Sequence, residues 1–305
     1  MRTKMIGYAF AGILASAALF AGNDAKSDNT EESTKGTRAV YGNIAIDQAE
    51  SLSTGDQILK AAAAGTPSVV WETLERGERV ECLNCISAVE PLLFDLNPTN
   101  REIAAWWLRR RIFGVFGPGE AYERTIQTLK NDSNPTKRAY AASALGEFLA
   151  APGIDACAEA IQNDSDAGVR AAAASALGRL NSDGNGALTK ALSDGDGKVK
   201  LAALKSASII NTSVDVASVA RLVDDGNAVV RRRALEVLDT YRAKDSVSAV
   251  LRLAKTDADA DVRLAACHAL GSFGDASARA ALESIAQNDA NGLVRDQARI
   301  AARRL

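Results

Sequence analysis

The sequence predicts an all-α fold, an α-solenoid of about seven stacked helix pairs that follows a short helical cap. The chain is rich in Ala and only 5% aromatic, a composition that suits close helix packing. An Asp is followed six positions later by a basic residue at regular intervals along the chain. Steps between successive basic residues, counted from a degenerate first copy at Asp95/Arg101, are 37, 32, 30, 31, 32 and 32. Such a constant interval indicates a repeat array. The six regular pairs are Asp132/Arg138, Asp164/Arg170, Asp194/Lys200, Asp225/Arg231, Asp257/Arg263 and Asp289/Arg295.

The first 25 residues are typical of an export signal. Arg2 and Lys4 precede an uncharged apolar run from Met5 to Ala21, and small and polar residues follow as far as Ala25. That run is short for a membrane span. We therefore expect cleavage after Ala21 or Ala25, with an uncleaved anchor as the alternative. The expected location is the periplasm or cell envelope, with secretion left open, and no membrane insertion is expected after removal of the signal.

Three further segments complete the predicted domain organisation. Residues 26–46 are polar and lack apolar periodicity, so we expect a disordered linker. Residues 47–79 are expected to form a helical cap of two helices, the first ending at Gly65-Thr66-Pro67. The solenoid should then occupy residues 80–305, and the cap should cover its N-terminal end.

The segment from Ile154 to Leu180 shows what a regular unit contains. Residues 154–163 are expected to form a first helix with one apolar face, and residues 169–180 a second. Between them, Asp164-Ser165-Asp166 offers side-chain oxygens to the unpaired amides that begin the second helix. The predicted repeat is therefore a helix, a capped turn and a helix.

Alignment of the second helices on their basic residue shows which faces are buried. The third position after it is Ala in all seven units, and the seventh is Leu or Ala. These positions share one helix face and predict a buried seam of small side chains. The fifth position is mostly polar and is therefore expected to be exposed. Its residues are Trp106, Ser143, Ser175, Lys205, Glu236, His268 and Ile300.

The recurring Asp, the basic residue six positions later, the Val before it and the Ala-Leu-Gly near the helix end resemble HEAT repeats of the short, bacterial, phycobilisome-lyase-like type. Copies of the last motif stand at Ala144-Leu145-Gly146, Ala176-Leu177-Gly178 and Ala269-Leu270-Gly271. The resemblance covers about 220 residues and implies a right-handed stack of helix pairs. It also implies that the recurring Asp and Arg pair along the turns as a structural ladder. The family includes scaffolds, lyases and some enzymes, so the resemblance does not define an activity.

The first unit departs from the repeat at several positions. Trp106 occupies the polar fifth column, Trp107 stands where other units have small residues, and Arg109, Arg110 and Arg111 follow. One interpretation is a partner-binding patch of Trp106, Arg109 and Arg110 on the concave second-helix face, where an indole flanked by guanidinium groups could hold an acidic or aromatic segment. The other is that the N-terminal cap covers this helix and both indoles belong to the core.

Cys82 and Cys85 have a spacing shared by redox pairs, zinc half-sites and haem attachment sites. Haem attachment requires a following His, whereas Ile86 is present. In an oxidising compartment we expect a local structural disulfide; a redox-active or regulatory pair and two reduced thiols remain as alternatives.

The other metal-ligand types are scarce and dispersed. Cys157 and Cys267 lie on apolar helix faces and are expected to be buried, while His268 is expected on the surface. A zinc site would need two ligands beyond the Cys pair, and these three residues belong to later repeats. No metal and no cofactor are therefore expected. The run Arg231-Arg232-Arg233 is expected to be solvated.

The leading functional hypothesis is an exported, non-catalytic scaffold that binds another envelope protein through its concave helical surface. No catalytic constellation is recognisable in the sequence, and a net charge of −2 disfavours nucleic acid as a partner. The alternative is a thiol-redox or cofactor-delivery accessory factor that uses Cys82 and Cys85. The sequence leaves the oligomeric state open.

Overall fold

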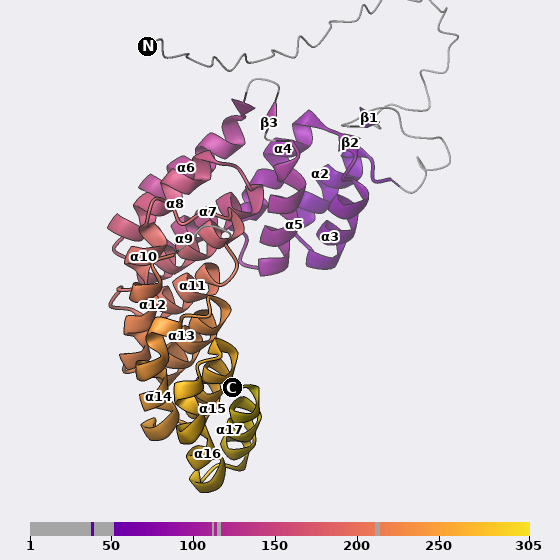
Figure 1. Cartoon of the computed structure of the whole chain (residues 1–305). Coiled ribbons are helices and arrows are strands. Elements are labelled where there is room, and N and C mark those ends of the chain that lie inside the picture. The colour runs from indigo at the N-terminus through magenta and orange to yellow at the C-terminus, as the bar shows by residue number, and fades with distance from the viewer. Residues whose placement is uncertain (1–37, 40–51, 112, 115–116, 211–213) are drawn as a thin grey trace, which may run out of the picture. The chain divides into compact units, whose positions relative to one another are not determined.

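Paired helices follow one another along the chain in a computed structural model that describes residues 38–39, 52–111, 113–114, 117–210 and 214–305 (Figure 1). Residues 36–305 form one compact unit. The predicted signal peptide, almost all of the predicted linker and the first residues of the predicted cap lie outside the described residues. None of the described helices combines the length and the apolar character needed to cross a bilayer.

Two short helices begin the described part of the chain. Helix α2, Gly55–Ala64, starts with a capping box in which Thr54 and Gln57 bind each other's backbone N–H groups. It ends at Gly65, whose φ of 65° is left-handed and costs little without a Cβ. Helix α3, Pro67–Arg76, follows at once.

A small region with two short strand pairings connects these helices to the regular array. Strand β1, Arg38–Ala39, pairs antiparallel with β2, Val80–Glu81. The next helical elements are α4, Leu83–Val89, the 3-10 helix Glu90–Phe94, and α5, Pro98–Arg109, which packs on α3. Strands β3, Phe113–Gly114, and β4, Gly117–Pro118, then form a second antiparallel pair within the long linker.

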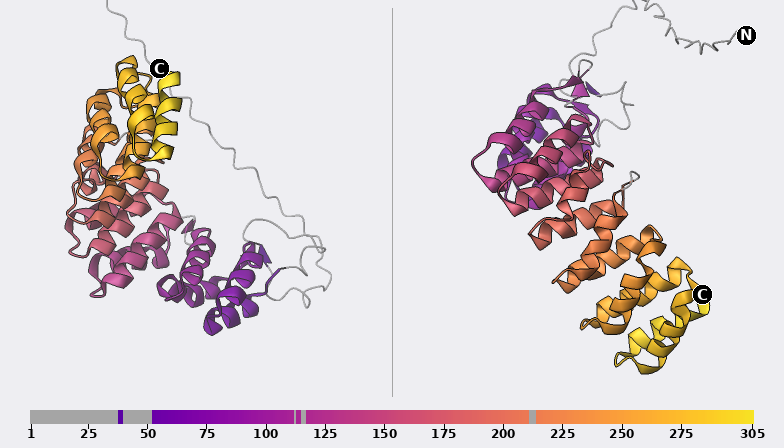
Figure 2. Two further views of the ribbon diagram at one scale, coloured as in Figure 1. Left: turned by 90° about the horizontal axis from the view of Figure 1, so that it is seen from below. Right: turned by 60° about the vertical axis from the view of Figure 1, so that its left-hand side comes forward.

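Six helix pairs make up the rest of the chain, and two further views show the same succession (Figure 2). The second helices α7, α9, α11, α13, α15 and α17 pack side by side in this order. The predicted α-solenoid is confirmed. The pairs are α6, Glu120–Asn131, with α7, Pro135–Phe148; α8, Pro152–Asn163, with α9, Ala167–Arg179; α10, Ala187–Ala191, with α11, Gly197–Ala207; α12, Val216–Arg221, extended by a 3-10 turn, with α13, Ala228–Thr240; α14, Val247–Thr256, with α15, Ala260–Phe273; and α16, Arg279–Asn288, with α17, Gly292–Arg304.

Small residues allow neighbouring second helices to approach closely. The seven Ala residues of the third column are all fully buried, as predicted. A Cβ added to Gly146 would lie 2.9 Å from the Ala176 Cα, and one added to Gly271 would lie 3.0 Å from the Ala301 Cα. No side chain fits in such a gap, which explains the Gly at the end of the Ala-Leu-Gly motif.

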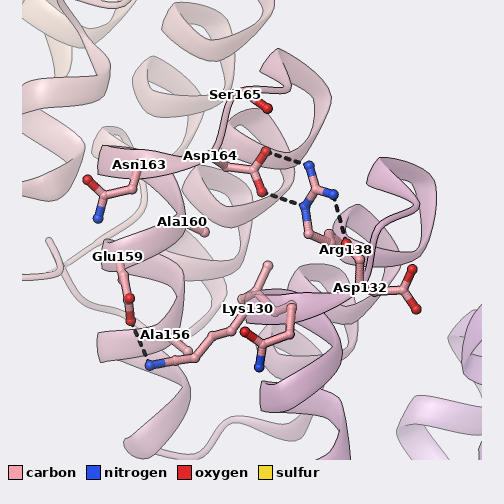
Figure 3. Close-up of a pocket in the computed structure, with 11 residues that line it drawn as sticks. Lys130, Asp132, Arg138, Ala156, Glu159, Ala160, Asn163, Asp164 and Ser165 are labelled. Carbon is pink, nitrogen blue, oxygen red and sulfur yellow. Dashed lines mark hydrogen bonds and ion pairs between the residues drawn. The ribbon is translucent and has the colours of Figure 1, made fainter.

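The acidic and basic columns form ion pairs between consecutive units. Arg138 binds the Asp164 carboxylate of the next unit through Nε and Nη2, at 2.7 and 2.9 Å, and its Nη1 donates to the Asp132 carbonyl of its own turn (Figure 3). Arg170, Arg231 and Arg263 likewise bind their own turn and the next unit's acid, whereas Lys200 binds only the acid, Asp225. We call this set the ladder. Its rungs are Arg138–Asp164, Arg170–Asp194, Lys200–Asp225, Arg231–Asp257 and Arg263–Asp289.

The acidic residues of the ladder also organise the turns in which they stand. Asp164 accepts the Asp166 N–H, and Asp166 in turn caps α9 by accepting the Val169 N–H, as the sequence predicted. A lost acid would therefore affect the ion pair and the turn together.

Candidate functional site

The exposed side chains of α5, α7, α9, α11, α13, α15 and α17 form one face of the array, which we call the second-helix surface. Every residue of the fifth column is solvent-exposed except Trp106, which is half-buried. Short side chains such as Ala139, Ser143 and Ser175 occupy this surface on α7 and α9. A partner could therefore approach the helix backbones closely at this part of the surface.

A pocket of about 320 Å³ lies on the second-helix surface, and we call it the α5–α7 groove. Its lining includes the buried Leu93, Arg101 of α5, and Tyr140 and Ser143 of α7. The small Ser143 and its neighbour Ala144 leave the space that a longer side chain would fill. The groove therefore offers an apolar floor with polar groups at its edge.

Charged residues of both signs border the groove. Glu147 of α7 forms an ion pair with Arg179 of α9, so the pair connects two consecutive units across the surface. Burial raises the pKa of Glu147, while the nearby Arg179 acts in the opposite direction. Glu102 is exposed beside it. Two Arg and two Glu residues line the groove, so its formal charge is balanced.

The three residues of the predicted partner-binding patch differ in exposure and in the groups that they contact. Trp106 is half-buried and packs against the core; Arg109 is half-buried; Arg110 is exposed and forms an ion pair with Glu78 at 2.8 Å. The patch interpretation needs an exposed Trp106 and the alternative needs a buried one. Trp106 is half-buried, so its exposure lies between the two.

Trp107 and Arg111 show why the first unit breaks the repeat. Trp107 is completely buried, and its Nε1 donates to the Gly77 carbonyl at 3.0 Å. The Arg111 guanidinium stacks on the Trp107 ring at 3.5 Å and donates to the carbonyls of Gly77, Glu78 and Val80. The cap thus does cover Trp107. Arg111 stands where later units have apolar residues such as Phe148 and Leu180, and this departure was the sequence signal for its role. Its partners lie more than 30 residues away and were not recognisable from the sequence.

Cys82 and Cys85 are bonded to each other in the structure, with their Cα atoms 5.2 Å apart. Cys82 is half-buried and stands just before α4, whereas Cys85 is fully buried. The pair lies against Gly55 of α2, since the Cys85 Sγ is 3.5 Å from the Gly55 carbonyl oxygen. The pair thus lies where α4 packs against α2. Export of the protein to an oxidising compartment stays a prediction.

The remaining candidate residues lie far from this pair in the array. Cys157 and Cys267 are free thiols and fully buried, and burial raises the pKa of each to about 12. His268 is exposed near Asp239 and Gln297. Of the Arg231-Arg232-Arg233 run, the first belongs to the ladder and the other two pair with Glu236. Within the described ranges, no group of three His, Cys, Asp or Glu could hold a metal ion.

A second pocket, also of about 320 Å³, lies between the first helices α6 and α8 and their turns (Figure 3). Lys130 pairs with Glu159 at 2.6 Å across it, and Arg138 pairs with Asp164. The Asp132 carboxylate points away from Arg138 (Figure 3). These contacts join successive units, so this pocket belongs to the ladder.

Stacked helix pairs with capped turns and ion pairs between units define an α-solenoid repeat protein. HEAT repeats match three overlapping segments of the chain, residues 122–185, 154–238 and 217–303. The chain belongs to the HEAT-repeat family.

Comparison with solved structures supports the fold. YibA of E. coli matches with a TM-score of 0.56 and 18% identity, over 82% of this chain and 92% of that chain. Kap95p, in its complex with RanGDP, matches with a TM-score of 0.58 and 14% identity, over 86% of this chain and 40% of Kap95p. No curated protein sequence matches the chain. At these identities the likeness concerns the fold alone.

Proposed function

We propose that this protein is an exported, non-catalytic scaffold that holds another protein of the cell envelope on its second-helix surface. The observation that carries the proposal is the α5–α7 groove, a hollow of about 320 Å³ on the face where helices of successive units lie side by side. Extended surfaces of this kind are what solenoids offer to partners. Kap95p, which shares the fold, is bound to RanGDP in its solved structure.

Export rests on the sequence alone, on the charged start, the apolar run to Ala21 and the small residues that follow. The bonded Cys82 and Cys85 are consistent with this location, because such a pair would be oxidised outside the cytosol.

Site-specific photo-crosslinking tests the binding surface. A photoreactive residue at Ser143 or Ser175 would stand on the second-helix surface, and one at Gln127 or Ser284 would stand at an exposed position on a first helix. We expect both second-helix positions, in cells of the source organism, to give a covalent product with the same protein. The two first-helix positions serve as matched controls. Equal products from all four positions, or none from Ser143 and Ser175, would contradict the proposal.

The second candidate is a thiol-redox accessory role, which the asymmetry of the cysteine pair favours. Cys82 is partly accessible and precedes a helix, while Cys85 is buried behind it, so Cys82 would be the sulfur that a partner reaches. A Cys85→Ser variant should then trap the partner as a mixed disulfide on Cys82. A Cys82→Ser variant provides the matched control and should trap nothing.

A further inference from the structure

The ladder uses the donors of each Arg in one fixed way. In the regular rungs, Nη1 binds a carbonyl of the residue's own turn, while Nε and Nη2 bind both oxygens of the next unit's Asp. The same arrangement is found at Arg170, Arg231 and Arg263, with carboxylate contacts between 2.7 and 3.0 Å. The fork formed by Nε and Nη2 is therefore a carboxylate site wherever the repeat is regular.

Arg101 occupies the same position in the first unit, and there the next acid does not reach it. Its Nη1 donates to the Asp95 and Leu96 carbonyls at 2.7 and 2.9 Å, as in a regular rung. The corresponding acid, Asp132, accepts the Asn134 N–H just as Asp164 accepts the Asp166 N–H, but no ion pair joins it to Arg101 in the described part of the chain. The step from Arg101 to Arg138 is 37 residues, longer than the steps of 30 to 32 elsewhere, so a longer linker separates the first unit from the second.

The guanidinium of Arg101 is nevertheless held in place. It lies over the Tyr140 ring, with Cζ 3.9 Å from the ring centroid. Neither Nε nor Nη2 makes a hydrogen bond to a described residue, and neither is a buried atom without a partner. Solvent therefore reaches the edge of the fork while Tyr140 fixes its face.

Arg101 is a lining residue of the α5–α7 groove, together with Tyr140 and Ser143. Two acidic residues, Glu102 and Glu147, also line the groove. Glu147 is already paired with Arg179, and Glu102 is solvent-exposed, so its charge is screened. Arg101 is consequently the cation of the groove that no carboxylate of the described chain engages.

We propose that Arg101, stacked on Tyr140, is the carboxylate receptor of the α5–α7 groove and binds an Asp or Glu side chain of the partner protein through Nε and Nη2. The proposal rests on the function proposed above and specifies the chemistry of the partner. A side chain from outside would take the place that the next unit's Asp takes in the regular rungs.

Arginine side-chain NMR of the full chain, titrated with a hexaglutamate peptide, tests the fork directly. The Nε–H signal of Arg101 should shift saturably, and that of Arg138, whose fork is occupied, should not. A hexaglutamine peptide should leave both signals unchanged. Equal shifts at Arg101 and Arg295 would overturn the proposal, because Arg295 also lacks a carboxylate in the described chain but has no aromatic ring beneath it.

Variants separate the fork from simple charge. Arg101→Lys keeps the charge but loses the two-donor geometry, and it should weaken hexaglutamate binding about tenfold. Tyr140→Leu should weaken it several-fold. Arg295→Lys is the matched control and should leave the affinity unchanged. An Arg101→Lys variant that binds hexaglutamate with wild-type affinity would overturn the proposal.

The same variant distinguishes this inference from the proposed function. If the Ser143 crosslink forms in the wild type and is lost in Arg101→Lys, the scaffold and the carboxylate receptor are both supported. Unchanged crosslinking and unchanged peptide affinity in Arg101→Lys overturn the carboxylate receptor and leave the scaffold standing. Absence of crosslinks from Ser143 and Ser175 in the wild type overturns the scaffold itself.

Discussion

Trp107 and Arg111 fasten the N-terminal helices to α5 at the scale of single residues. The buried indole of Trp107 donates to the Gly77 carbonyl just after α3. The Arg111 guanidinium stacks on that indole and donates to the same carbonyl. Trp106, one position away, faces the second-helix surface with part of its ring in solvent. Adjacent residues on a helix point about 100° apart, so one indole can belong to the core and the next to the surface.

Truncation of the two indoles should therefore have unequal effects. Trp107→Ala should lower the free energy of unfolding by about 3–5 kcal/mol, because it leaves a large cavity and removes both the indole hydrogen bond to the Gly77 carbonyl and the ring on which Arg111 stacks. Trp106→Ala should cost about 1 kcal/mol, since part of its ring is already hydrated. Urea unfolding followed by circular dichroism measures both. A loss at Trp106 as large as that at Trp107 would show that both indoles are core.

The ladder acts at the scale of the elements, since each rung joins the turn of one helix pair to the turn of the next. The hydrogen bonds from Arg170 hold the pKa of Asp194 below its usual value, and those from Arg263 do the same for Asp289. Both acids are largely buried beside their partners, with side-chain exposures of 12% and 8%. Their pairing is therefore less screened than that of a surface ion pair.

The lowered pKa values predict how stability depends on pH. A carboxyl whose pKa is lower in the folded state stabilises the fold above its unfolded pKa, and the contribution is lost as pH falls through the folded value. Asp194→Asn should thus cost about 2 kcal/mol at neutral pH, and the gap from wild type should shrink below about pH 5. Urea unfolding between pH 7 and pH 3 measures it, with Glu283→Gln as an exposed control. A gap that is constant with pH would rule out this role.

The cysteine pair predicts a local effect at the same scale. Replacement of both Cys82 and Cys85 by Ser should destabilise α2 and α4 by about 2 kcal/mol, since the bond closes only a short loop. Hydrogen exchange should show faster opening of these helices and no change in α15 to α17, because units of a solenoid contact only their neighbours. Of the 4 Cys residues, two should react with a thiol reagent after unfolding without reductant. Four reactive thiols would contradict the bond.

The proposed export concerns the whole molecule. The protein isolated from its source should begin at Gly22 or Lys26, because the segment before these residues has the pattern of a cleaved signal. Intact mass and N-terminal sequencing of the envelope fraction measure the start. Leu14→Arg, which interrupts the apolar run, should leave unprocessed protein in the cytosol. A chain that retains Met1 and stays in the membrane would support the uncleaved anchor instead.

The sequence by itself determined the solenoid, the family and the buried seam, because a fixed interval and the periodicity of each helix are local properties that repeat in register. It also located the capped turns, since the Asp side chains bind amides within three residues. Only the tertiary structure decided that each ladder Arg pairs with the Asp of the next unit, and that Trp107 is buried while Trp106 is half-buried. It also decided that Arg101 stacks on Tyr140 and forms no ion pair with a described acid. These outcomes depend on distances between side chains of different units, which an alignment of the columns within each unit does not contain.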